Sequence, residues 1–105
     1  MKYSMIQFKA DVLRNIDFNL PPVFKGRIPF ELTYSEYHDE FGNNIWYAEY
    51  GQVSLRATIA PAVGDIPEHA KFRVFVCNTP IISSEMGYGF WKAVVNLLVS
   101  EMKRP

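Results

Sequence analysis

If residues 90–99, near the C-terminus, form a helix, that helix is apolar around almost its whole circumference. Between Phe90 and Val99 the polar side chains are Lys92 and Asn96, which are four residues apart and share one narrow stripe. A helix that lies on one sheet usually buries an apolar stripe roughly 100° wide. Something must therefore cover more of this helix than a single sheet face covers.

Two arrangements would provide that cover. In the first, a curled sheet and the N-terminal segment pack against both flanks of the helix, as is usual for a helix that is hydrophobic nearly all round. In the second, the flank around Trp91, Val95 and Leu98 contacts a partner protein or a second copy of the chain, because contiguous exposed apolar patches usually mark interaction surfaces. The sequence leaves both arrangements open.

The residues at either end of this stretch suit a helix. Ser83 or Ser84 can cap its N-terminus, and Lys103 suits the negative C-terminal end of the helix dipole. Gly89 weakens the first turn, so we expect the regular helix to begin near Phe90.

Four earlier segments have the patterns of β-strands. In the clearest, residues 53–60, apolar residues alternate with polar ones such as Ser54 and Arg56, which is typical of a sheet with one face on the core and one in water. Short turn-forming segments join the first three strands at hairpin distance, which predicts an antiparallel meander. The expected strands are residues 30–37, 45–50, 53–60 and 71–77, and the expected loop before the last of them is 61–70.

The N-terminal segment fits two structures. Alternation typical of a strand is found at Ile6, Phe8, Ala10 and Val12. The spacing of a helical face is found at Met5, Phe8, Val12 and Ile16. Alternation resumes between Ile16 and Leu20, so we expect an extended N-terminal pair, with a helix over residues 5–16 as the alternative.

These elements predict a single α+β domain over residues 1–105, in which an antiparallel β-meander of four or more strands packs against one C-terminal α-helix. A length of 105 residues is close to the commonest domain size. Hydrophobic residues make up 49% of the chain and charged residues 21%, which is the balance of a globular protein and not of a disordered one.

Charge and composition restrict the function classes. Basic and acidic residues number eleven each, so the net charge is zero, whereas phosphate contacts supply much of the affinity of a nucleic-acid binder. Nucleic acid is therefore a disfavoured partner. The longest apolar runs have four residues and a membrane-spanning helix needs roughly 20, so no membrane contact is expected. With Cys77 as the single cysteine, no intramolecular disulfide can form, which predicts a cytoplasmic protein.

Candidate reactive groups have simpler structural interpretations. The cluster His38, Asp39 and Glu40, together with His69, contains metal-ligand types, but its spacing matches no known metal motif and favours a solvated loop. Cys77 follows an apolar strand, which favours a small buried hydrophobe over a nucleophile. We expect no catalytic residues, no metal and no cofactor.

Two further patterns suggest binding sites. Gly87 and Gly89 at the helix start resemble part of a phosphate-binding loop, but Lys92 stands where a dinucleotide fingerprint needs its third glycine. The segment containing Arg73 and Phe75 interleaves basic and aromatic residues as single-stranded nucleic-acid platforms do, although a half-buried central strand explains the same pattern.

Large aromatic side chains are more numerous than one core face readily holds. They favour a protein interface, since Tyr and Trp combine a large apolar area with a polar group, although cross-strand pairing would also explain them. The sequence thus predicts a non-catalytic protein-binding module, such as a small inhibitor or accessory subunit, which acts on another protein or on itself. Its expected partner-binding residues are Trp46, Tyr47, Tyr88, Trp91 and Val95.

Two alternatives belong to other classes. One is a small-ligand-binding protein or enzyme with a pocket between sheet and helix, in which His38 or His69 provides the polar group. The other is a single-stranded nucleic-acid binder that uses Arg73 and Phe75.

Overall fold

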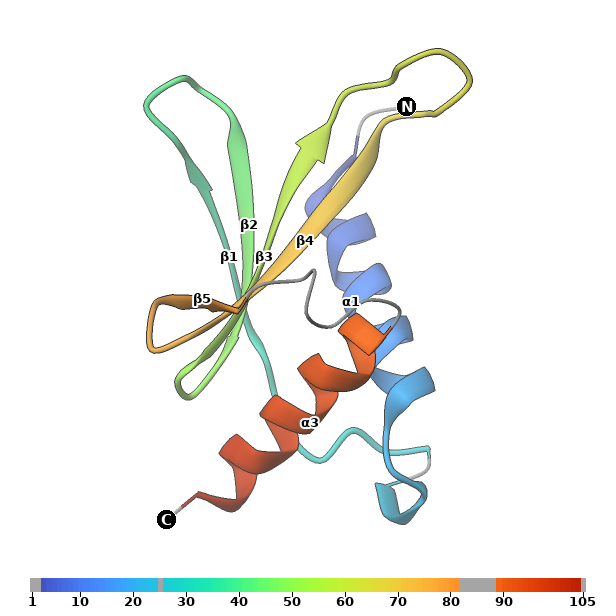
Figure 1. Cartoon of the computed structure of the whole chain (residues 1–105), viewed down its shortest axis with the longest axis vertical. Helices are drawn as coiled ribbons and strands as arrows, with labels where there is room; N and C mark the ends of the chain where they lie inside the picture. Colours follow the sequence, from blue (N-terminus) through green and yellow to red (C-terminus); the bar gives the residue numbers. More distant parts are fainter. Residues whose placement is uncertain (1–2, 25, 82–88, 105) are drawn as a thin grey trace.

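The computed structural model of the chain describes residues 3–24, 26–81 and 89–104. It is an α+β fold in which a five-stranded antiparallel sheet carries two helices on one face (Figure 1). The strands follow one another in chain order as a meander, so the predicted fold class is confirmed. The elements are α1 (Met5–Asn19), a 3₁₀ turn η1 (Pro22–Phe24), β1 (Thr33–His38), β2 (Asn44–Tyr50), β3 (Val53–Ala60), β4 (His69–Val76), β5 (Thr79–Ile81) and α3 (Phe90–Lys103).

The N-terminal segment is a helix, so the expectation of an extended pair there is wrong. Ser4 caps α1, and its side chain accepts a hydrogen bond from the backbone N–H of Gln7. Phe8, Val12 and Ile16 are fully buried at a spacing of four, whereas Ile6, which shared the alternating pattern with Phe8, is 82% exposed. The alternating pattern of the N-terminal segment therefore does not reflect a strand, because the residues with helical spacing are the ones that face the core.

Helix α3 begins at Phe90, as expected, and has Lys103 in its last turn. Its proposed serine caps, Ser83 and Ser84, lie outside the described residues. Helix α1 packs beside α3 on the same side of the sheet, which places the buried residues of both helices in one core (Figure 1). Helix α1 therefore provides the additional cover that the apolar surface of α3 requires.

The core between the helices and the sheet centres on Phe8. Its ring stacks on Phe72 with the ring centroids 5.9 Å apart, and it also contacts Trp46 and Tyr34. Alternate residues of each central strand face this side, as Leu55 and its cross-strand partner Val74 do. The intervening residues face the opposite side, which neither helix covers.

The turn between β2 and β3 is tied to the end of α3. Glu101 accepts a hydrogen bond from the backbone N–H of Gln52 at 2.9 Å. Gly51, the residue before Gln52, has φ +57°, and a Cβ atom at this position would collide with the Glu101 side chain, so the turn requires glycine there. Arg104 also donates to the Gln52 side chain, so the hairpin and the helix end hold each other in place.

Within residues 3–24, 26–81 and 89–104, no helix has the length and apolar character needed to cross a membrane.

Candidate functional site

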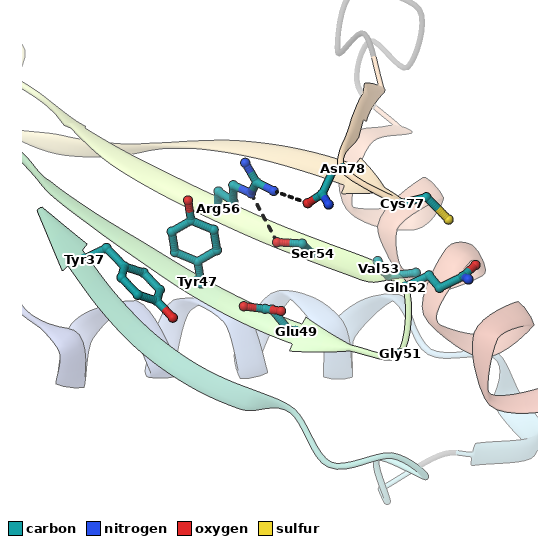
Figure 2. A pocket seen from close by; sticks show the side chains of 10 residues that line it. All are labelled: Tyr37, Tyr47, Glu49, Gly51, Gln52, Val53, Ser54, Arg56, Cys77 and Asn78. Atoms are coloured by element: carbon teal, nitrogen blue, oxygen red, sulfur yellow. Dashed lines mark hydrogen bonds between the residues drawn. The ribbon is translucent and has the colours of Figure 1, made fainter. Parts of the chain in front are cut away.

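The face of the sheet opposite the helices is the candidate site, and we call it the open face. Figure 2 shows its side chains on the near side of the strands, with the helices behind them. The register lines up Tyr47 of β2, Arg56 of β3 and Arg73 of β4 in one row across the sheet. Phe75 pairs with Ser54 in the next row. The residues come from different strands, so the meander itself brings them together.

Arg56 is fixed at the centre of the open face. Its guanidinium carbon lies 3.7 Å from the ring centroid of Phe75 and 4.9 Å from that of Tyr47. Its Nε donates a hydrogen bond to Ser54 Oγ at 3.2 Å, and its Nη2 donates to Asn78 Oδ1 at 3.1 Å (Figure 2). Cation–π contacts and hydrogen bonds together restrict this side chain to one orientation.

The turn after β4 brings Asn78 to Arg56. Cys77 and Asn78 both have positive φ, 51° and 64°, as in the tight hairpin turns that match the twist of a sheet. Asn adopts this conformation readily, whereas Cys does so at some cost. The backbone N–H of Cys77 donates to Gln52 O at 3.0 Å, which joins this turn to the β2–β3 turn. Cys77 is exposed, so its interpretation as a buried hydrophobe is wrong.

Two shallow depressions adjoin Arg56 and Tyr47. The first, of about 590 Å³, extends past Glu49 and Asn78 to the β2–β3 turn (Figure 2). The second, of about 320 Å³, lies over β2, β3 and β4. Its lining residues are Ile45, Tyr47, Arg56, Thr58, Lys71, Arg73 and Phe75.

The open face is more basic than the chain as a whole. Arg56, Lys71 and Arg73 all line the second depression, and the acidic residue of the neighbouring depression is Glu49. In the part of the chain that the structure describes, the ion pairs are Arg14 with Asp11 and Arg104 with Glu101, both away from this face. The cations of the open face thus have no carboxylate partner among the described residues.

The five residues expected to bind a partner do not form one surface. Tyr47 lies on the open face, where its ring meets Tyr37 edge-on. Trp46 and Val95 are core residues, exposed by 2% and 0%. Trp91 is half-buried against Phe72 of β4, and Tyr88 lies outside the described residues.

Sequence reasoning missed Arg56 as a site residue. The alternation in β3 placed it on the solvent side with Ser54, which was the available signal. Its other neighbours depend on cross-strand register and on the conformation of Asn78, which no pattern in the sequence specifies. Arg73 and Phe75, noted for the interleaving of basic and aromatic residues, do lie beside it.

Within the described ranges of the chain, the His38 cluster and His69 do not form a common metal site. His38 ends β1 and His69 begins β4, and both are exposed. Among the described residues, no group of three or more His, Cys, Asp or Glu side chains has the geometry of a metal site. Asp39 instead organises the β1–β2 loop, because its carboxylate accepts hydrogen bonds from the backbone N–H groups of Asn43 and Phe41. The same hydrogen bonds lower the pKa of its carboxyl group.

The open face combines hydrogen-bond donors with apolar rings. A fixed arginine can bind an oxyanion through two parallel N–H groups, and the neighbouring rings provide apolar contact area. No family model, curated protein or solved structure matches the chain.

Proposed function

We propose that this chain is a non-catalytic protein-binding module that acts through the open face of its sheet. The observation that carries the proposal is Arg56, held between Tyr47 and Phe75 at the centre of a face that neither helix covers. Arg and Tyr are enriched among the residues that dominate binding energy at protein interfaces. A rigid pair of this kind also loses little conformational entropy when a partner binds.

The helix flank is a weaker candidate for the interface. Helix α1 packs beside α3, and none of the described α3 residues is among the large hydrophobic residues that are strongly exposed. Trp46 and Val95 contribute to the core and so support the open face from behind without contacting a partner.

The module binds another protein or a second copy of itself, as a small inhibitor or accessory subunit would. A net charge of zero gives little electrostatic protection against self-association. The single cysteine supports a cytoplasmic location, since disulfides are rare there.

Site-specific photo-crosslinking in the native host tests the proposal. A photoreactive amino acid replaces Tyr37, which is 55% exposed at the margin of the open face. The control places it at Arg14 on the outer side of α1, where the side chain is 71% exposed. We expect one defined protein, or the chain itself, to be crosslinked from Tyr37 only, and this crosslink to disappear in Arg56→Ala. The same products from both positions would contradict the proposal.

A single-stranded nucleic-acid binder is the second candidate, because Lys71 and Arg73 share a depression with Phe75. Against it, the guanidinium of Arg56 covers one side of the Phe75 ring, where a base would stack. This candidate predicts steeply salt-dependent binding to an oligonucleotide, and no binding at low salt would end it. A small ligand between sheet and helices is less favoured, since Phe8 and Val94 fill that space.

A further inference from the structure

We infer that the open face recognises carboxylates, and that its partner presents an extended acidic segment to Arg56, Lys71 and Arg73. This inference rests on the proposed function and adds the chemistry of the partner. It assigns Arg56 as the central contact, with the other two cations along one side. The second depression, lined by these three residues, is the place where an acidic side chain would lie.

Arg56 has hydrogen-bond donors that are not used within the chain. A guanidinium has five N–H donors, and here one on Nε and one on Nη2 are used by Ser54 and Asn78. The remaining donors, on Nη1 and Nη2, suit a carboxylate that accepts two parallel hydrogen bonds. Because Phe75 and Tyr47 already fix the guanidinium plane, binding does not have to order this side chain.

Two cations of the open face form an unfavourable charge pair. Arg56 and Arg73 are direct cross-strand partners and both face the open side. Lys71 lies opposite Thr58, in the next pair on the same face of this ladder. Like charges placed directly opposite each other destabilise an antiparallel pair. A carboxylate between them replaces this repulsion with attraction, which gives the arrangement a physical role in binding.

The second depression is lined by cations and apolar side chains. The residues that line it include three cations and no acid. Ile45 and the two rings of Tyr47 and Phe75 supply apolar surface beside the cations. A segment in which acidic and apolar residues alternate matches this surface, since side chains of an extended chain alternate in direction.

A peptide is favoured over a nucleic acid as the partner, because Arg56 already covers one face of the Phe75 ring. The face of Phe75 toward Arg56 is occupied at 3.7 Å, so the ring cannot stack on a base from that side. Three cations on a chain with zero net charge also supply few phosphate contacts. A carboxylate needs one bidentate contact, which Arg56 alone provides.

The test uses the full chain and a short fluorescein-labelled peptide in which Glu alternates with Leu. Fluorescence anisotropy compares this peptide with its Gln–Leu counterpart and with an oligothymidylate. We expect saturable binding of the Glu peptide, about tenfold weaker binding of the Gln peptide, and no tighter binding of the oligonucleotide. Tighter, Arg56-dependent binding of the oligonucleotide would overturn the inference.

Variants locate the binding. Arg56→Gln should weaken binding of the Glu peptide about tenfold, and so should Arg73→Gln, whose side chain is exposed in the native protein. The control is Lys92→Gln on α3, which also removes one positive charge but lies away from the open face, and it should leave binding unchanged. Arg73 is the safer site if Arg56→Gln perturbs the fold. Equal affinities in Arg73→Gln and Lys92→Gln would overturn the inference.

If the Glu peptide does not bind while the Tyr37 crosslink persists, the carboxylate inference fails and the binding module stands. If both are absent, both proposals fail.

Discussion

Arg73→Gln should stabilise the free protein while it weakens binding. Arg73 is exposed and lies directly opposite Arg56, so its replacement removes a repulsion and leaves the hydrogen bonds of Arg56 to Ser54 and Asn78 intact. Two unit charges about 8 Å apart in water repel by roughly 0.5 kcal/mol. For a domain of this size, that gain raises Tm by about 2–4 °C.

Thermal unfolding followed by circular dichroism measures this gain at low and high salt. Salt screens exposed charges, so the difference between Arg73→Gln and the unchanged protein should shrink at 1 M salt, where the Debye length falls to about 3 Å. Lys92→Gln provides the control and should not reproduce this salt-dependent gain in Tm. A lower Tm for Arg73→Gln, or a gain that salt leaves unchanged, would refute the reasoning from charge repulsion.

The remaining predictions concern the fold. Phe8→Ala, at the centre of the core, should lower the free energy of unfolding by about 3–5 kcal/mol in urea titrations; a loss below 1 kcal/mol would show that α1 does not pack there. Gly51→Ala should cost about 1–3 kcal/mol, because its φ is positive and Cβ collides with Glu101; Gly42→Ala, with positive φ and open space, should cost less. Burial, and for Tyr3 also its hydrogen bond to Asp11, raises the pKa of Tyr3 and Tyr34. The neutral phenols are therefore favoured in the folded state, so stability should be full below about pH 10 and fall above it. Urea unfolding between pH 8 and pH 11 checks this, and an equal fall in Tyr3→Phe would remove Tyr3 from the explanation.

The sheet could be predicted because its signals are local. Residues 53–60 alternate over the full length of β3, and turn residues separate the first three strands at hairpin distance. The N-terminal segment could not be assigned in this way, because Phe8 and Val12 belong to both the alternating and the helical pattern. Only packing decides between them, and it buries Ile16 and exposes Ile6.

That ambiguity also affected the expected interface. The apolar surface of α3 is compatible with cover by the sheet and the N-terminal segment or with cover by a partner, and the sequence leaves both arrangements open. With α1 packed against it, Val95 becomes a core residue. On the sheet, Tyr47 and Trp46 are neighbours in β2, but adjacent residues of a strand point to opposite faces. Trp46 is buried against Phe8 of α1 and so faces the helices.

The contacts that fix Arg56 could not be predicted from the sequence, for a different reason. Its contacts come from three elements, with Tyr47 on β2, Phe75 on β4 and Asn78 in the turn that follows. Cross-strand register and turn conformation set these contacts, and a shift of one residue would turn Phe75 toward the helices.

The central claim is that an acidic segment binds the open face through Arg56. A titration of the ¹⁵N-labelled protein with the Glu–Leu peptide, followed by NMR, tests it most directly. We expect the Arg56 Nε–H signal and the amide signals of Tyr47, Arg73 and Phe75 to shift together until the protein is saturated. Shifts confined to α1 or α3, or an unmoved Arg56 signal at saturation, would contradict it.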